Sequence, residues 1–276
     1  ALYGINTLGA FFGCLFTGYF ILPSIGYRNT ILLCAVINLF IFFLATNKIS
    51  IFSFPRWQDL LIFINSLPKT HKAFNRSDYF YLSTIFTSGL CSIGIQVLWN
   101  RYTSLLYGGT VFTFTLVTSV VLLGICLGSY WVQRKLKSAI NHEKDLVLLL
   151  ICSAITILLG SHIFASSGLT VLFWHQYFDT TNFIFTILQF TLILACLLPG
   201  ATLLGCLFPY ALSLFLKDKN DGSDKVAICY ALNIGGIVIG SILVTFVIIP
   251  ISGIEGLKNI LPLLLILVTV PYSRLA

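Results

Sequence analysis

The stretch that decides the fold reads Tyr230-Ala-Leu-Asn-Ile-Gly-Gly-Ile-Val-Ile-Gly240, and Pro250-x-x-Gly253 follows it after a short apolar run. The same pattern begins 227 residues earlier, at Tyr3, and ends at Gly26. The copies share seven identities in 24 ungapped positions, and six of these are Tyr, Asn, Gly or Pro, which apolar similarity alone would not match. The sequence therefore contains an internal duplication. We expect most of the first repeat to lie before Ala1, which makes the chain a fragment.

The composition is that of an integral membrane protein. Hydrophobic residues make up 58% of the chain and charged residues 9%, with a mean hydropathy of +0.97, whereas about a quarter of the residues in a soluble domain are charged. Apolar runs of about 20 residues recur without a charge in their middle, as in membrane-spanning helices. We therefore predict an all-α, multi-pass helix bundle in the lipid bilayer, of the bacterial inner (plasma) membrane type.

The net charge of +7 does not indicate nucleic-acid binding, because most of the 16 Lys and Arg residues lie between the apolar runs. Basic connections are typical of the cytoplasmic side of a multi-pass protein. The eight cysteines are scattered singly and form no CxxC or Cys/His cluster. We therefore predict no nucleic-acid partner, no metal site, no cofactor and no disulfide scaffold.

Eight spans are predicted, and one of them is ambiguous. Residues 181–216 would form about 54 Å of helix, too long for one upright crossing of a roughly 30 Å core, and Pro199 and Pro209 could break it. One tilted crossing places 13 of the 16 basic residues on one side, whereas two crossings leave 10 there. The stronger bias favours one crossing. The spans then start near residues 2, 30, 79, 111, 146, 181, 226 and 257.

The duplication and the spans together predict a parallel-repeat architecture. Residues 1–46 would hold the last two helices of the first repeat, and residues 79–276 would form a complete six-helix second repeat. Between them, residues 47–78 form a basic cytoplasmic linker, whose apolar middle, Trp57–Leu67, is expected to lie along the membrane surface. Two six-helix halves in the same orientation are similar to the major facilitator transporters.

Four motifs resemble the membrane domains of spermidine synthase-like (polyamine aminopropyltransferase-like) proteins, and together they cover nearly the whole chain. They are Trp99-Asn100-Arg101 at a helix end, Gly124-x-x-x-Gly128-Ser129, the segment Pro199–Pro209 with Gly205, and the duplicated Tyr-x-x-Asn-x-x-Gly-x-x-x-Gly helix. The resemblance implies that a cytoplasmic Rossmann-like transferase domain or subunit accompanies the membrane part.

The chain departs from this family in two respects. Nothing in it resembles the catalytic domain, so we expect no catalytic residues and no aminopropyltransferase activity in this piece. Gln96 also stands where the family often has a Glu. The resemblance thus implies a membrane domain that anchors or serves a transferase domain. The alternative is a major-facilitator-like transporter of a small neutral or anionic solute; all nine acids lie in loops or at span ends, which argues against polyamine transport.

Asn6 and Asn233 are candidate site residues because each is a polar group inside an apolar run. Each lies one turn from a glycine pair, so it either hydrogen-bonds to a neighbouring helix or lines a central cavity together with its repeat partner. Close helix packing is predicted at the three glycine pairs, Gly9/Gly13, Gly124/Gly128 and Gly236/Gly240.

Trp99 and Arg101 are the second pair of candidates. They are typical interfacial anchors, or together with Gln96 they face a cavity and bind an anionic group such as a carboxylate. His162 and His175 are predicted to be interface residues rather than ligands or proton carriers.

Overall fold

The computed structural model describes residues 2–48, 75–136, 143–177, 183–216 and 222–270, and each regular element among them is a helix. The all-α prediction is therefore confirmed for these residues. The chain divides into two compact units: unit 1 comprises Ala1–Leu15 and Asn75–Ala276, and unit 2 comprises Phe16–Phe74. Each unit is described by itself below.

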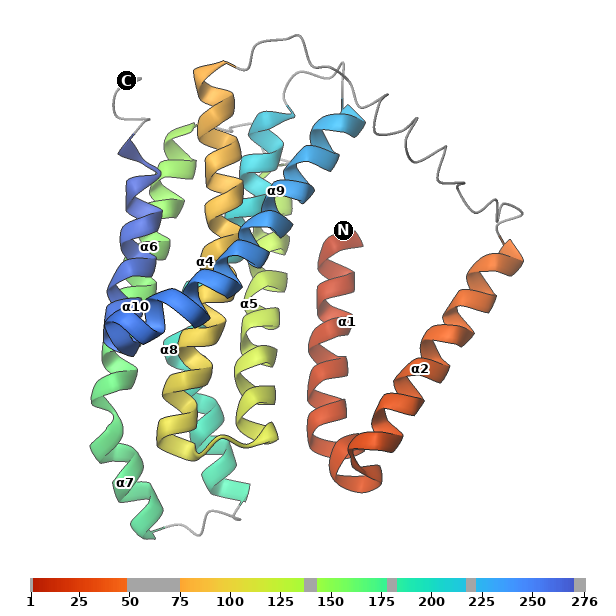
Figure 1. The fold of residues 1–276 in the computed structure, drawn as a ribbon, viewed down its shortest axis with the longest axis vertical. Coiled ribbons are helices and arrows are strands. Elements are labelled where there is room, and N and C mark those ends of the chain that lie inside the picture. The colour runs from red at the N-terminus through yellow and green to blue at the C-terminus, as the bar shows by residue number, and fades with distance from the viewer. Residues whose placement is uncertain (1, 49–74, 137–142, 178–182, 217–221, 271–276) are drawn as a thin grey trace. The chain divides into compact units, whose positions relative to one another are not determined.

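Unit 1 is organised around the long helix α4, which contacts each of α5, α6, α8, α9 and α10. Figure 1 shows α4 between α10 and α5. The helices of this unit are α1 (Leu2–Phe16, whose last residue belongs to unit 2), α4 (Arg76–Tyr107), α5 (Val111–Leu136), α6 (Glu143–Ser166), α7 (Gly168–Tyr177), α8 (Phe183–Phe215), α9 (Gly222–Leu243), the π-helix η3 (Val244–Ile248) and α10 (Ile249–Leu267).

Local sequence signals set both ends of α4. At its start, the Asn75 backbone N–H donates a hydrogen bond to Asp78 Oδ2 at 2.9 Å, which satisfies a donor that the first turn leaves unpaired. At its end, Gly108 has φ of 86° and its N–H donates to the Ser104 carbonyl at 3.1 Å. A glycine adopts this backbone conformation without a Cβ clash. The 32 residues of α4 therefore extend for about 48 Å.

The segment 181–216 contains one continuous helix. α8 runs for 33 residues with Pro199 and Pro209 inside it, so neither proline ends it. Proline removes one backbone hydrogen bond and tends to kink a helix rather than reverse the chain. Contacts with α5, α6 and α4 along its length support the helix through both prolines.

The two copies of the duplicated sequence have the same local backbone features. In unit 2, the π-helix η1 (Thr17–Ile21) leads into α2 (Leu22–Lys48), and in unit 1 η3 leads into α10 at the same repeat offset. Each following helix contains one non-helical residue, Gly26 (φ 76°, ψ 168°) in α2 and Gly253 (φ 67°, ψ −172°) in α10. The chain is kinked at both glycines, each of which separates two helical stretches.

Among the residues that the structure describes, six helical segments are long and apolar enough to cross a membrane, by length and composition. Eight separate spans were predicted, and the difference arises at the repeats. The residues on both sides of Gly26 and Gly253 stay helical, so two predicted spans join into the segment Gly4–Leu44 and two more into Lys225–Leu267. The other four segments are Ser77–Tyr107, Val111–Leu136, Glu143–Ser166 and Ile184–Phe215.

The connection after α6 contains a helix that the sequence analysis did not predict. The sequence analysis assigned no separate helix between the span that starts near residue 146 and the one that starts near residue 181, but Gly168–Tyr177 forms α7 there. Val171 is buried where α7 begins, and its N–H donates a hydrogen bond to the Ser167 carbonyl at 3.0 Å, which starts the helix. The predicted interfacial helix Trp57–Leu67 lies outside the described residues.

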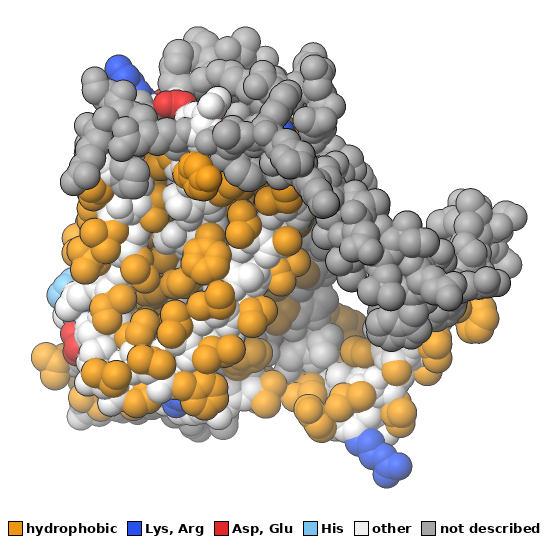
Figure 2. Space-filling view, turned by 45° about the horizontal axis from the view of Figure 1, so that its top comes forward, with side chains coloured by type: hydrophobic (Ala, Val, Ile, Leu, Met, Phe, Trp, Pro, Cys, Tyr) orange, Lys and Arg blue, Asp and Glu red, His pale blue; other side chains and the backbone are white. Residues whose placement is uncertain are grey.

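The surface of unit 1 is largely apolar. Large hydrophobic side chains such as Phe246, Ile251 and Leu263 are exposed, and Figure 2 shows hydrophobic side chains across the face in view. A contiguous apolar surface of this extent is unfavourable in water and favourable in lipid. These observations support an integral membrane protein.

Candidate functional site

Lys258 is a buried cation inside an apolar helix. It lies in α10 and is 4% exposed. Its ammonium group donates a hydrogen bond to Glu255 Oε2, one turn earlier. An ionisable side chain inside a membrane segment is costly and marks a candidate functional site.

Glu255 links Lys258 to α4. Tyr102 Oη of α4 donates to Glu255 Oε1 at 3.1 Å, so the carboxylate accepts from both neighbours. His162 of α6 lies close enough to Glu255 to interact with it electrostatically. We call Tyr102, His162, Glu255 and Lys258 the Lys258 cluster.

The Lys258 cluster is asymmetric in its exposure. The Glu255 side chain is 67% exposed, whereas the Lys258 side chain is 6% exposed. The carboxylate therefore covers a buried pair of donors, the Lys258 ammonium and the Tyr102 hydroxyl, from the outside. An incoming anionic group that displaced the carboxylate would find the same two donors, which gives the cluster the chemistry of an anion-binding site.

Trp99 belongs to the core of unit 1. It is 1% exposed, and its ring packs on Phe164 of α6 with centroids 4.7 Å apart. Arg101, two residues later, is exposed. The structure therefore separates the two residues and places Trp99 among packed helices rather than at a surface where it could anchor the chain.

Gln96 faces a different helix. Its Nε2 donates to Thr118 Oγ1 of α5 at 3.3 Å. The three residues Gln96, Trp99 and Arg101 thus point to α5, to α6 and to the surface respectively, and they do not form a single site. Lys258 and Tyr102 form a pair of donors that already hold a carboxylate, that of Glu255.

Asn233 takes part in the contact between α9 and α4. Ser88 Oγ donates to Asn233 Oδ1 at 3.4 Å. A Cβ added to Gly236 would lie 2.1 Å from the Phe86 carbonyl oxygen, and one added to Gly89 would lie 2.3 Å from the Asn233 carbonyl oxygen. The two backbones approach this closely because each helix has a glycine, without a side chain, at the point of contact. Gly240 extends the contact, since its Cβ would lie 3.0 Å from Leu90 Cα.

The α5–α8 contact is built in the same way. A Cβ on Gly124 would lie 2.6 Å from Ala201 Cβ, and one on Gly128 would lie 2.2 Å from the Thr202 carbonyl oxygen. Gly205 of α8 makes the same kind of close contact with α5, because a Cβ added to it would lie 2.6 Å from Ile125 Cα. The glycines of this contact belong to two of the motifs that carry the family resemblance.

The first copy of the repeat has a different environment. Asn6 is exposed, and a Cβ added to Gly9 or Gly13 would meet no atom within 4 Å among the described residues. The two asparagines Asn6 and Asn233, which could have formed a symmetric pair, therefore differ in exposure and in surroundings.

A second polar cluster lies at the other end of the helices. Asp145, at the start of α6, forms an ion pair with Lys135 of α5 at 2.9 Å and accepts a hydrogen bond from Tyr210 Oη of α8 at 3.1 Å. Tyr81 Oη of α4 donates to Glu143 of α6. These contacts join α4, α5, α6 and α8, with the ion pair partly exposed and both tyrosines buried, so the cluster connects helices.

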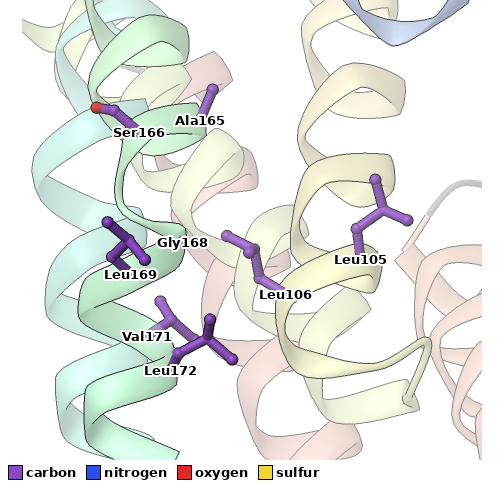
Figure 3. A pocket seen from close by; sticks show the side chains of 8 residues that line it. All are labelled: Leu105, Leu106, Ala165, Ser166, Gly168, Leu169, Val171 and Leu172. Carbon is purple, nitrogen blue, oxygen red and sulfur yellow. The ribbon is translucent and has the colours of Figure 1, made fainter.

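Two of the pockets in unit 1 are apolar. One of about 450 Å³ lies where α4, α6 and α7 meet. Leu106 of α4 and Leu172 of α7 project into it (Figure 3). The other, of about 810 Å³, is lined by residues of α1, α5, α8 and α9, among them Leu8, Leu127 and Phe208. Apolar walls next to lipid suit acyl chains better than a polar solute.

The sequence analysis missed the Lys258 cluster. Lys258 lies close to the predicted start of the last span, so the sequence analysis counted it only as one of the three basic residues on the side of the membrane with fewer of them. The available signal was an acid and a base three residues apart, Glu255 and Lys258, directly after the glycine that ends the duplicated stretch. At this spacing the two side chains lie on one face of a helix.

The described residues contain no group of three His, Cys, Asp or Glu side chains that could hold a metal ion. His175, predicted to be an interface residue, lies in α7, and His162 lies on the exposed side of α6. Comparison of the chain with family models, with curated proteins and with solved structures gives no match.

Proposed function

We propose that this chain is the membrane domain of a spermidine synthase-like protein and that it holds a transferase domain or subunit at the cytoplasmic face of a bacterial inner membrane. The observation that carries the proposal is where the resembling motifs lie. Gly124, Gly128 and Gly205 form the α5–α8 contact, and Gly236 and Gly240 form the α9–α4 contact. The motifs therefore serve helix packing, as expected of a scaffold.

Close packing also suits the scaffold role energetically. Helices in lipid associate through van der Waals contact and hydrogen bonds, because apolar burial between them is no gain over lipid. Five glycines lie so close to a neighbouring helix that an added Cβ would clash with it. These contacts hold the helices of unit 1 against one another. A rigid body of this kind can orient an attached domain at the membrane surface.

The proposed topology has eight crossings in two parallel repeats. α8 is one uninterrupted helix, which supports one crossing there. The glycine bends at Gly26 and Gly253 support a reversal of the chain in each duplicated segment. The basic residues at 47–78, 133–145 and 217–225 then share the cytoplasmic side.

Two experiments test this proposal. The reading frame beyond Ala276 should encode a Rossmann-type strand–glycine-rich turn–helix pattern, whereas a stop codon or a polar tail would contradict the proposal. The purified 276-residue chain, incubated with putrescine and decarboxylated S-adenosylmethionine, should form no spermidine above background. Such a reaction needs a base that frees the amine lone pair, and turnover that disappears on replacing Asp221 or Asp224 would overturn the assignment of a purely membrane role.

The Lys258 cluster favours a second candidate, transport or binding of a small anionic solute. Two buried donors, Lys258 and Tyr102, face a single exposed carboxylate. Uptake of radiolabelled small carboxylates into proteoliposomes distinguishes the two candidates. Saturable uptake that is lost in Lys258→Met and retained in Lys135→Gln, which alters the polar cluster at the opposite helix ends, would favour the transporter. Equal, non-saturable uptake with the unmodified chain, Lys258→Met and Lys135→Gln would support the scaffold role.

A further inference from the structure

We propose that the Lys258 cluster and the apolar pocket where α4, α6 and α7 meet, here called the α7 pocket, together bind one amphipathic ligand, a free medium-chain fatty acid. Its carboxylate would replace that of Glu255 beside Lys258 and Tyr102, and its hydrocarbon chain would lie in the α7 pocket. The inference rests on the anion-binding chemistry behind the second candidate function above, and it names the class of anion.

The α7 pocket lies one helical turn from the Lys258 cluster along two helices. In α4, Leu106 of the pocket follows Tyr102 of the cluster by four residues, and in α6 Ser166 of the pocket follows His162 by four. Side chains at this spacing lie on one face of a helix, with about 5–6 Å between their Cβ atoms. The third helix of the cluster, α10, packs against both α4 and α6. The polar cluster and the apolar pocket are therefore neighbouring parts of unit 1.

The size and the lining of the α7 pocket suit a hydrocarbon chain. Its volume is about 450 Å³, within the range of about 300–1,000 Å³ for small-molecule sites. Leu106 and Leu172 project into it from α4 and α7 (Figure 3), and a Cβ added to Gly168 would lie 3.9 Å from Leu106 Cδ2. Ser166 is the one lining residue with a polar side chain, and its hydroxyl already donates to the Ile163 carbonyl at 2.9 Å. The pocket thus offers no free donor to a polar solute.

The groups beside the α7 pocket select a carboxylate. Lys258 and Tyr102 already donate to one, that of Glu255, and charge-assisted hydrogen bonds of this kind are the strong ones. Arg101 is exposed on α4, one turn before Leu105 of the pocket, and it forms no ion pair with another residue that the structure describes. One acid thus stands against two cations, which favours an anion there. A ligand with a carboxylate at one end and an apolar chain at the other matches both parts.

The probe is decanoic acid that carries a photoreactive diazirine at the end of the chain far from the carboxylate. It is added to the 276-residue chain in phosphatidylcholine nanodiscs and irradiated, and mass spectrometry of the peptides locates the label. Residues 105–106 and 165–172 should carry more label than residues 148–155, a control stretch of α6 in which Leu148 and Ile155 are exposed. A matched probe with an alcohol in place of the carboxylate should show no such excess, because an alcohol carries no charge.

Two variants of the ion pair should change the labelling of the α7 pocket in opposite directions. Lys258→Met removes the ammonium donor and should lower the labelling about tenfold, which corresponds to about 1.4 kcal/mol. Glu255→Gln removes the competing carboxylate and should raise the labelling, since the probe then satisfies the buried ammonium. A merely structural role of the pair would move both variants the same way. Tyr102→Phe keeps the ring beside Phe164 and should give a smaller decrease, which maintains the test if Lys258→Met does not fold.

Other results would overturn the inference. Equal pocket labelling by the acid and the alcohol, or labelling unchanged in Lys258→Met, would show that the probe only partitions into an apolar space. Loss of labelling when phosphatidylglycerol is added to the nanodiscs would assign the pocket to a phospholipid. Saturable uptake of a small carboxylate without pocket labelling would overturn the inference and leave the transport candidate standing. Pocket labelling by the acid without any uptake would support the inference and count against transport.

Discussion

Gly236 and Gly235 are adjacent glycines in α9 with opposite surroundings, and together they give a quantitative test of the α9–α4 contact. A Cβ on Gly236 would lie 2.1 Å from the Phe86 carbonyl oxygen, whereas a Cβ on Gly235 would meet nothing within 4 Å among the described residues. Ordinary van der Waals contact begins at about 3.4 Å. The Gly236→Ala side chain therefore requires α9 and α4 to separate by about 1 Å, a gap that forfeits up to half of each contact's dispersion energy.

The expected free energies follow from two effects of opposite sign. Replacing glycine by alanine in a helix interior stabilises the helix by about 0.8–1.0 kcal/mol, and this applies to both positions. Overpacking at Gly236 destabilises the protein by about 1–3 kcal/mol. Gly235→Ala should thus raise the free energy of unfolding slightly, and Gly236→Ala should lower it relative to Gly235→Ala by about 1–3 kcal/mol.

The measurement is reversible unfolding of the chain in mixed micelles, followed by helix circular dichroism. A difference of 1 kcal/mol corresponds to about 2–4 °C in Tm for a chain of this size class. Gly9→Ala, at the equivalent position of the first copy, should behave like Gly235→Ala, because no described atom lies near its Cβ. If Gly236→Ala and Gly235→Ala changed stability equally, the inference that backbone contact at Gly236 joins α9 to α4 would be refuted.

Three further predictions concern the bends, the Lys258 cluster and the topology. Gly253→Ala and Gly26→Ala should each destabilise the chain by about 1–3 kcal/mol in the same unfolding assay, because both glycines have positive φ with extended ψ, a region that other residues rarely adopt. A change below about 0.5 kcal/mol at both positions would contradict this. Glu255→Gln should destabilise more than Lys258→Met, by about 1 kcal/mol, because it leaves the buried ammonium without its carboxylate, and the double variant should recover stability relative to Glu255→Gln. Single cysteines placed in 133–145 and in 217–225 should both resist a membrane-impermeant thiol reagent applied from outside intact cells, because both connections are basic; labelling of the second alone would contradict the eight-crossing topology.

The sequence predicted the helical class because apolar runs without central charges have few alternatives in a membrane. What it could not predict was that residues on either side of Gly26 and Gly253 remain helical, since the pattern Pro-x-x-Gly is equally typical of a loop. The helix α7 was missed for a related reason: its few apolar residues are too short a run to indicate a span.

Candidate site residues were predictable only as types of residue. Asn233 and Gln96 were identified as polar groups in apolar helices, but the partners that define their roles, Ser88 and Thr118, lie on other helices. Lys258 was overlooked because its burial depends on how α10 packs on α4 and α6 after the bend. Tertiary packing of this kind leaves no local trace in sequence.

The π-helices η1 and η3 have a consequence for how the repeats work as mechanical parts. A π-turn accommodates one residue more than an α-helical turn, and each residue of an α-helix advances its face by about 100°. The wide turn absorbs the extra residue, so the surface of Asn233, Gly236 and Gly240 before it keeps its angular relation to the glycine bend after it, and the first copy contains the same turn. Deleting one residue from Val244–Ile248 would convert the π-turn into an α-helical turn and leave this relation nearly unchanged. Deleting one residue from the α-helical part between Gly236 and Val244 would instead rotate the bend by about 100° relative to the residues before the deletion. The π-helix is thus the place in each copy where the length of the chain can change without a change in orientation.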